Sequence, residues 1–462
     1  MIKNKNSVVL ALAFFISAYV FAQDKEWTLK ESINYALENN IAVKQSLIDQ
    51  ELAVQDLKFA KGNFLPTANA NASQSWNFGS FIDQNGSRIS VDSRGNSFGL
   101  NTGITLFNGF RNINTKKQAE LGIESSKIQL NILKNNISLN VVNAYLNILF
   151  NKETIKQAQD QVKISKESLN QVQELVNSGV RARADLLVSK SQLAADNERL
   201  VNAQNSVDLS LLSLAQLLQI PSEGFKIQDV DINLTEAVLI YKDSKEIVSY
   251  AIENRPEIKG AQLNIDNAEL NYQIARSAYY PTVSFGANAS TSYQHLQGQD
   301  DVRTILVGFD TAGNPITELR KNGFDVQFKD NLGYNVGFNL NIPIFNGFKT
   351  DVNVQRAKLS KDRISLALEQ ERQTLTANIE QAYADAKATL LQYESSKLSL
   401  ESQELAYQNE QDKYDLGVST SFQLEQVRNR LINAQSSFLN AKYNFVFKTK
   451  VLDFYLDKPI TE

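Results

Sequence analysis

Four segments of the chain alternate apolar and polar residues with a period of two. They lie at about 66–78, 96–107, 281–293 and 331–344. Apolar residues occupy every second position, and the residues between them are Asn, Ser, Thr and Gly without a charge. A period of two places successive side chains on opposite faces, so each segment is predicted to be a β-strand with one apolar and one polar face.

Two interpretations of these strands fit the alternation. A soluble antiparallel sheet packed on helices would show it equally well. However, each strand runs about 11 residues, the length that a tilted strand needs to cross a bilayer, and an uncharged polar face suits a narrow, wet lumen. Aromatic residues also gather where strand meets helix, as in one girdle of an outer-membrane barrel. These residues are Phe64, Phe107, Phe110, Tyr279, Tyr280, Phe345 and Phe348. We therefore favour strands that span a membrane.

Four membrane-spanning strands cannot close a barrel, because about eight is the smallest number that does. Open strand edges are not tolerated in lipid, so the chain is expected to form an oligomer. A dimer would supply eight strands and little lumen, whereas a trimer would supply twelve and leave a pore. The segments 81–96 and 295–330, between the strands of each pair, are polar and contain glycine. They are expected to be hairpin tips that face the outside.

Two very long stretches carry the strongest helical signal. Residues 111–178 contain no proline and one glycine, and residues 349–416 contain neither. Apolar residues such as Leu130, Leu133 and Ile137 step by three and four, which is typical of a helix. Each stretch would form a helix about 100 Å long, so it needs neighbours along its whole length. Further helices are expected at 28–39, 41–61, 181–219, 244–254, 256–277 and 419–456.

The order of these elements occurs twice, because the chain is an internal duplication. The motif that begins at Tyr35 returns at Tyr250, 215 positions later, and the motif that begins at Phe107 returns at Phe345, 238 positions later. The second copy therefore holds about 23 extra residues between its two strands (238 minus 215). Such a long repeat predicts a pseudo-symmetric pair rather than a solenoid.

The repeats and the chain ends give the expected domain organisation. Residues 1–22 combine Lys3 and Lys5, a short apolar stretch and a small-residue site, which predicts a cleaved secretory signal peptide. The other parts are a first repeat over 23–220, an equatorial connector over 221–243, a second repeat over 244–458 and a short tail over 459–462.

The composition excludes several function classes. The net charge is −4 with no basic stripe, so nucleic-acid binding has little support. The chain has no cysteine, one histidine (His295) and one methionine (Met1). A catalytic triad, a His- or Cys-based zinc site and a soft-metal duct therefore lack the residues they need. No enzyme activity, cofactor or metal is expected.

Several stretches that recur in order carry a resemblance to a known family. The stretches are Arg255 to Ile258, Ala275 to Ser277 followed by Pro281, Phe107 to Phe110, Phe345 to Phe348, Gly179 with Asp185 to Leu187, and Ala441 to Phe445. Their order, spacing and duplication matter more than any single motif. Taken together, they resemble the TolC-type outer-membrane efflux protein family over essentially the whole mature chain.

The resemblance implies an α+β membrane protein of the Gram-negative outer membrane. Three chains would form a 12-stranded β-barrel in the lipid on an α-helical tunnel in the periplasm. The trimer would be the passive exit duct of a tripartite efflux pump or a type I secretion system. Its partners would be a periplasmic adaptor protein and an inner-membrane pump. Because the lumen shows only small polar groups, substrate choice is expected to lie mainly in the pump.

The family also implies a gate at the helix tips, where Tyr, Arg and Asp links close the tunnel. The tips here are the turns at Gly179 and Gly417. Asp185 and Tyr414 match the linking Asp and Tyr of the family. The linking Arg and the two Asp residues that ring the constriction are replaced, however, by Ser419, Gln423 and Gln426. The family's own salt links and anionic rings are therefore not expected in this chain.

Other charged residues near the two turns are candidates for a substitute gate. Arg181 and Arg183 could pair with Asp185, Asp412 or Asp415. Equally, all of them could be solvated tip charges, since exposed ion pairs contribute only about 0–1 kcal/mol. An alternative for the whole chain is a periplasmic coiled-coil adaptor or scaffold with a soluble β domain.

Overall fold

The computed structural model describes residues 26–82, 86–90, 92–230 and 238–459. The expected signal peptide lies outside these ranges, as do parts of the expected connector and tail. The described chain divides into two compact units. The helical unit comprises the described residues of 1–50, 125–262 and 366–462, and the strand unit comprises those of 51–124 and 263–365. Each unit draws on both sequence repeats, so the repeats are not separate compact bodies.

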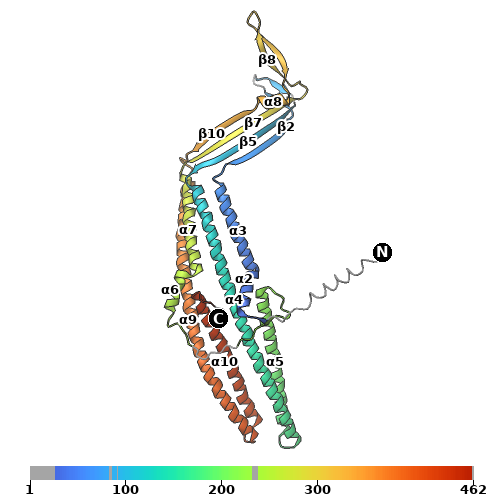
Figure 1. The fold of residues 1–462 in the computed structure, drawn as a ribbon, viewed down its shortest axis with the longest axis vertical. Helices are drawn as coiled ribbons and strands as arrows, with labels where there is room; N and C mark the ends of the chain where they lie inside the picture. Colours follow the sequence, from blue (N-terminus) through green and yellow to red (C-terminus); the bar gives the residue numbers. More distant parts are fainter. Residues whose placement is uncertain (1–25, 83–85, 91, 231–237, 460–462) are drawn as a thin grey trace, which may run out of the picture. The chain divides into compact units, whose positions relative to one another are not determined.

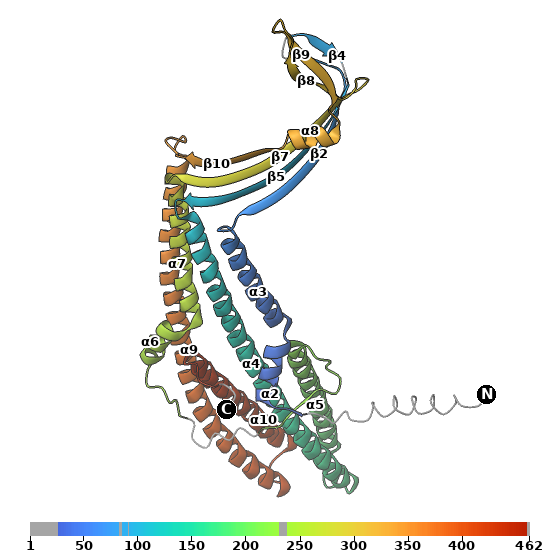
Figure 2. The same ribbon diagram turned by 45° about the horizontal axis from the view of Figure 1, so that its top comes forward.

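The strand unit contains a four-stranded antiparallel sheet (Figures 1 and 2). Its strands are β2 (Thr67–Asn77), β5 (Ser93–Asn108), β7 (Thr282–Leu296) and β10 (Gly333–Asn341). The order across the sheet is β10-β7-β5-β2, so the two repeats join through β5 and β7. Strands β2 and β10 are edge strands within the described residues. β10 ends before residue 344, where it was expected to end, because Pro343 has no N–H for the ladder.

The segments between the strands differ from the simple polar tips that the sequence predicted. The first contains a small hairpin of β3 (Ser80–Ile82) and β4 (Arg88–Ser90). The second contains a hairpin of β8 (Val302–Phe309) and β9 (Pro315–Lys321), followed by the short helix α8 (Phe324–Asp330). The 23-residue difference between the repeats falls in this second, more elaborate segment.

Two helices of 67 residues each, α4 (Arg111–Asn177) and α9 (Lys349–Asp415), pass from the strand unit into the helical unit. Thr28 and Thr420 begin α2 and α10 with reciprocal capping boxes, which satisfy backbone donors at a helix start. The shorter elements are α2 (Leu29–Asn39), α3 (Ile41–Gly62), α5 (Arg183–Leu218), α6 (Ser244–Asn254), α7 (Pro256–Arg276), η2 (Ser277–Tyr279), α10 (Ser421–Tyr455), and the paired strands β1 (Glu26–Trp27) and β6 (Lys226–Ile227).

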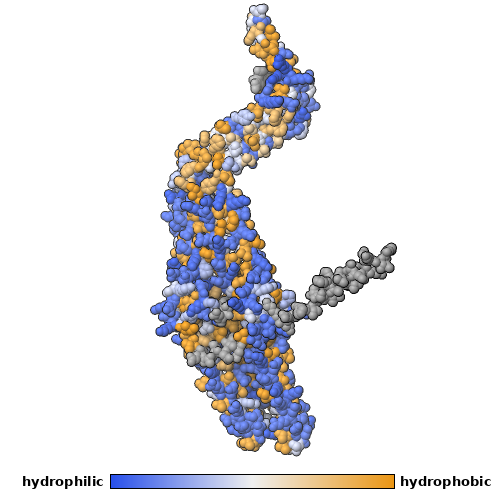
Figure 3. All heavy atoms as spheres, viewed as in Figure 1, coloured by the Kyte–Doolittle hydropathy of each residue, from blue (hydrophilic) through white to orange (hydrophobic). Residues whose placement is uncertain are grey.

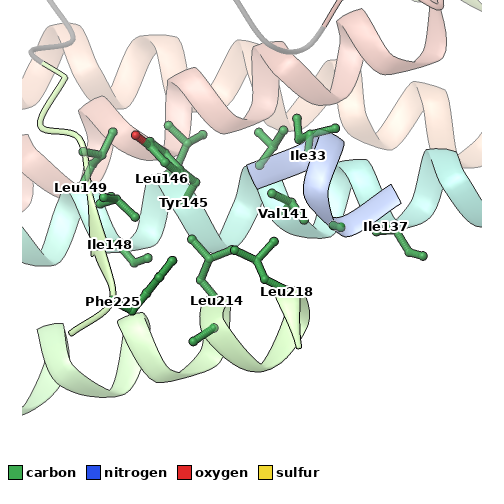
Figure 4. Close-up of a cluster of buried hydrophobic side chains, with 14 of the residues drawn as sticks. Ile33, Ile137, Val141, Tyr145, Leu146, Ile148, Leu149, Leu214, Leu218 and Phe225 are labelled. Atoms are coloured by element: carbon green, nitrogen blue, oxygen red, sulfur yellow. The ribbon is translucent and has the colours of Figure 1, made fainter. Parts of the chain in front are cut away.

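A hydrophobic cluster of the helical unit is built on the apolar stripe of α4 (Figure 4). Val141 and Ile148 on this stripe are fully buried, and they pack with Leu214 and Leu218 of α5 and with Ile33 of α2. Burial of such side chains contributes about 1.5–3 kcal/mol each. The stripe therefore fixes the shorter helices of the unit against the long one.

Equivalent tyrosines of the two repeats bind the backbone of the connecting segments. The Tyr145 hydroxyl lies 3.1 Å from the Trp27 carbonyl oxygen and 3.0 Å from that of Gln228. The Tyr383 hydroxyl, 238 positions later, donates to the Lys242 carbonyl oxygen at 2.6 Å. Each tyrosine thus ties a long helix to the non-helical chain that precedes a shorter one.

The hydroxyl of Tyr145 should make the stability of the helical unit depend on pH. Burial raises the pKa of Tyr145 to about 12, above the value near 10 of an unfolded tyrosine. The contribution of this hydroxyl to the free energy of unfolding is therefore complete below about pH 10, and it is lost as the pH rises from about 10 to about 12. Tyr145→Phe should cost about 1 kcal/mol at neutral pH, since two part-buried carbonyl oxygens lose their donor.

The measurement is the urea concentration at the midpoint of unfolding of the purified protein in detergent. Unfolding is monitored by circular dichroism at pH 8, 10 and 11.5. Wild type should lose more stability over this range than Tyr145→Phe. Tyr250→Phe, at an exposed tyrosine of α6, is the control and should follow wild type. An equal loss in wild type and Tyr145→Phe would contradict the assigned role.

Candidate functional site

One turn joins α4 to α5 and another joins α9 to α10, and the two turns have the same backbone structure. Gly179 and Gly417 have φ values of +78° and +74°, which glycine adopts without strain. In the first turn, Val180 N donates to the Leu175 carbonyl oxygen at 2.9 Å. In the second, the equivalent bond joins Val418 to the carbonyl of the residue five before it, also at 2.9 Å. Both turns therefore end their helix with the six-to-one bond of a Schellman motif.

Two side-chain contacts connect the turns to each other. The Arg181 guanidinium lies over the Tyr414 ring, 4.2 Å from its centroid, and donates to the Tyr414 carbonyl oxygen at 2.9 Å. The Ser421 hydroxyl donates to Asp185 Oδ1 at 2.6 Å. Burial raises the pKa of Tyr414 and outweighs the opposing effect of Arg181, so the phenol is neutral at physiological pH.

The partner of Arg181 differs from the acidic residues considered in the sequence. Arg181 contacts the ring and carbonyl of Tyr414, and Asp185 accepts from a serine. Asp415 accepts from Gln411 of its own helix. Among the described ion pairs, none includes Arg183 or Asp412.

The residues that replace the family's Arg and Asp positions have local roles. Ser419 is buried and donates to Glu410. Gln423 completes the capping box of α10 with Thr420. Gln426 is exposed on the next turn of the helix. In place of charges, these positions present neutral side chains.

A buried polar cluster, not recognised in the sequence, joins α10 to α4 and α5. Arg428 is 4% exposed and Asp196 is fully buried. Arg428 Nη2 lies 2.8 Å from Asp196 Oδ2 and 2.6 Å from Ser165 Oγ, and it donates to Gln161 Oε1 at 2.9 Å. Ser165 also donates to Asp196. Removal of one partner from a buried pair costs about 3–5 kcal/mol, because it leaves the other charge unpaired, so a movement that separated these helices would be costly.

A sequence signal for this cluster does exist. Arg428 lies between Leu424 and Leu431 on the buried stripe of α10, where a charge interrupts the apolar pattern. Its equivalent in the first repeat is Lys190, 238 positions earlier, and the equivalent of Asp196 is Ala434. The pair therefore joins an arginine of the second repeat to an aspartate of the first, and the equivalent positions cannot form it.

The polar face of the sheet is lined by uncharged side chains. Asn69, Asn101, Asn288 and Asn335 occupy one register row across all four strands. Asn101 Nδ2 donates to Asn71 Oδ1 at 2.9 Å, and Asn288 donates to Asn101. The row therefore presents hydrogen-bonding amides without a net charge.

The opposite face of the sheet is apolar and exposed. Leu100, Val336 and Phe338 are 55%, 71% and 74% exposed. Figure 3 shows hydrophobic residues over the strands and where they meet the helices. Such a large apolar surface is unusual for a soluble monomer and indicates a membrane or protein partner. No helix of the described residues is both long and apolar enough to cross a membrane.

The predicted aromatic residues lie at the helix-proximal end of this sheet. The rings of Phe107 and Phe110 are 5.3 Å apart, and those of Phe345 and Phe348 are 5.6 Å apart, in edge-to-face pairs. In each pair, the second phenylalanine and the glycine before it have positive φ. At Gly109 a Cβ atom would overlap the Ser277 carbonyl oxygen, so only glycine fits this turn. The other three, Phe64, Tyr279 and Tyr280, are 40–48% exposed.

Known proteins are similar to this chain in sequence and in fold. The family model for "Outer membrane efflux protein" matches residues 32–218 and 247–452. The chain is 23% identical to the outer membrane protein TolC of Escherichia coli K12 over 420 residues, which cover 88% of this chain and 78% of TolC. It is 21% identical to the protein CyaE of Bordetella pertussis over 426 residues, which cover 90% and 80% of the two chains.

Solved structures agree at the level of the fold. A crystal structure of CusC superposes with a TM-score of 0.77 at 18% identity and covers 95% of this chain and 96% of its own. The Campylobacter jejuni outer membrane channel CmeC superposes with a TM-score of 0.73 at 19% identity and covers 93% and 85%.

These matches and the two-faced sheet define an outer-membrane channel of efflux or secretion. The chain belongs to the outer membrane efflux protein family. Its fold is that of solved outer-membrane channels such as CusC and CmeC, with barrel strands and long tunnel helices in one chain. The predicted fold class, localisation and duct function are thus confirmed, and the soluble adaptor alternative is not supported.

The assignment of the two sheet faces is tested by neighbouring residues on β10. Val336→Arg places a charge on the lipid-facing side and should destabilise the inserted barrel by about 2–4 kcal/mol near the midplane. Asn335→Arg places the same charge on the lumen side and should insert normally. The measurement is the yield of each protein in outer-membrane fractions after carbonate extraction. Equal losses for both variants would show that the faces are wrongly assigned.

Proposed function

We propose that the turns at Gly179 and Gly417 form the periplasmic gate of this duct, and that a periplasmic adaptor protein opens it to an inner-membrane pump. The observation that carries the proposal is the nature of the contacts between the turns. They comprise one cation–π stack with its hydrogen bond and one serine–carboxylate bond. These contacts are only part-buried, and contacts of this type are worth about 1 kcal/mol each.

Weak links suit a gate that a partner protein opens. An adaptor shifts such an equilibrium by binding the open form more tightly than the closed form, and the shift needs only that difference in affinity. A closed state held by about 1–2 kcal/mol requires a correspondingly small difference.

The buried cluster around Arg428 limits how far the movement extends. Arg428 lies 11 positions after Gly417 (428 minus 417), and its bonds to Asp196 and Ser165 are shielded from water. We therefore assign the gating movement to the segment between the turns and this cluster. The rest of α10 stays against α4 and α5.

The gate is tested by single-channel conductance in planar lipid bilayers. Arg181→Ala combined with Ser421→Ala removes both contacts and should raise the ratio of open to closed time about fivefold, which corresponds to about 1 kcal/mol. Arg183→Ala changes the charge by the same amount at an exposed neighbour without an ion pair, so it should leave the ratio unchanged. Unaltered gating in the double variant would contradict the proposal.

We further propose that the lining of the barrel does not select the cargo. Relatives bear names such as "Toxin and drug export protein A" and "Cation efflux system protein CusC", whereas this sheet offers neutral amides and hydroxyls. The described residues also contain no group of three or more His, Asp or Glu placed to hold a metal ion.

Cargo selection is tested in a deletion strain complemented with wild type or with Asn101→Ser and Asn288→Ser together. Serine keeps the lining polar and neutral but removes the amides. The strains are compared for resistance to drugs and bile salts and for secreted protein. The variant should restore the same spectrum as wild type. A changed spectrum would assign selection to the barrel instead.

A further inference from the structure

The short helix α8 folds back onto the apolar face of the sheet (Figure 2). Its rings of Phe324 and Phe328 lie 6.3 and 5.6 Å from the ring of Phe98 on β5. Phe98 pairs in register with Thr291 of β7, and the Thr291 hydroxyl donates to the Phe328 carbonyl oxygen at 2.7 Å. The helix is therefore fixed to the same face that carries Leu100 and Val336.

Side chains around α8 also complete the edge of β7 where β10 is absent. The pairing of β10 with β7 reaches only as far as Ser290. Beyond it, Asn331 Nδ2 donates to the Ser292 carbonyl oxygen at 2.7 Å. Gln327 then bonds both the N–H and the carbonyl oxygen of Gln294, each at 3.0 Å. These amides satisfy backbone groups that would otherwise form an open strand edge, which lipid does not tolerate.

The outward side of α8 is chemically mixed. Phe324 and Phe328 remain 44% and 37% exposed, so their rings also face the surroundings. The charged residues Asp325, Lys329 and Asp330 are exposed beside them, and Asp330 pairs with Arg303 of β8. A segment with exposed aromatic rings and charges of both signs fits neither the hydrocarbon layer nor open water. It fits the boundary between them.

The length of the apolar band places that boundary at α8. From Val283, beside the aromatic residues at the helix-proximal end, to Thr291 under α8, β7 advances eight residues. This is about 27 Å along the strand and about 20 Å along the barrel axis at a usual tilt. Outer-membrane barrels carry an apolar band about 25 Å tall between two aromatic girdles. The helix thus lies where the second girdle is expected.

We propose that α8 is an interfacial helix that seats Phe324 and Phe328 in the headgroup layer of the outer leaflet. Three copies would surround the trimer as a collar at the outer rim of the barrel. The β8–β9 hairpin that precedes α8 then stands above the membrane. The first repeat has only the small β3–β4 hairpin at this level among its described residues, so the collar comes from the second repeat alone.

The absence of cysteine in the chain allows a direct depth measurement. Single-cysteine variants of the full-length protein are labelled with a nitroxide and reconstituted into vesicles of phosphatidylethanolamine and phosphatidylglycerol. Lys329→Cys reports the outward side of α8. Val336→Cys marks the hydrocarbon, and Thr311→Cys, in the β8–β9 turn, marks water. Collision rates with oxygen and with a water-soluble nickel chelate then give the depth of each label.

The Lys329 label should lie between the two references, at the level of the lipid phosphates. Two results would overturn the proposal. A Lys329 label as accessible to nickel as that at Thr311 would place α8 in water. A label immobile and shielded from both reagents would place α8 against a neighbouring copy of the chain. In both cases the label at Val336 shows whether the barrel itself is inserted, which separates failure of the collar from failure of the membrane assignment.

Discussion

The structure depends on the requirement that backbone groups in lipid be hydrogen-bonded. The sheet β10-β7-β5-β2 has two edge strands, and its apolar face is widely exposed. One chain cannot satisfy those edges or cover that face. Three chains would do so if β2 of one copy paired with β10 of the next and the barrel closed. The internal duplication serves the same end, since each repeat supplies one strand pair and one long helix with its return helix.

The same requirement explains why side chains of the second repeat bond the free part of the β7 edge. Along the part of β7 that lies before the start of β10, Asn331 and Gln327 bond the β7 backbone instead. In the helical unit, the contacts fall into two classes. The links at the turns are few and near water, whereas Arg428 and Asp196 are bonded inside the protein. With weak links at the tip and buried bonds behind them, the proposed gate would open locally rather than as a whole.

The regular elements could be predicted from the sequence because their signals are periodic and local. The alternation in β5 and β7 defines the strands and their faces, and the absence of proline over 111–178 defines α4. The fold class followed from these signals and from the family resemblance. Exact strand ends did not, since they depend on partners: β7 continues to Leu296 because β5 pairs with it there.

Contacts between distant segments were harder to foresee. Arg181 was expected near a carboxylate, yet it stacks on Tyr414, because the geometry of two helix ends decides which side chain it reaches. The packing of α8 depends on two phenylalanines within seven residues, too short a stretch to show a period. The charge at Arg428 was visible as an interruption of an apolar stripe, but its partner 232 positions away was not.

Three copies of this chain are expected to form one closed membrane duct. Native mass spectrometry of the protein, extracted by detergent from the outer-membrane fraction, measures the mass of this assembly. We expect a single species with three times the mass of the mature chain. A monomer, or recovery of the protein from the aqueous fraction before detergent is added, would rule out the closed duct.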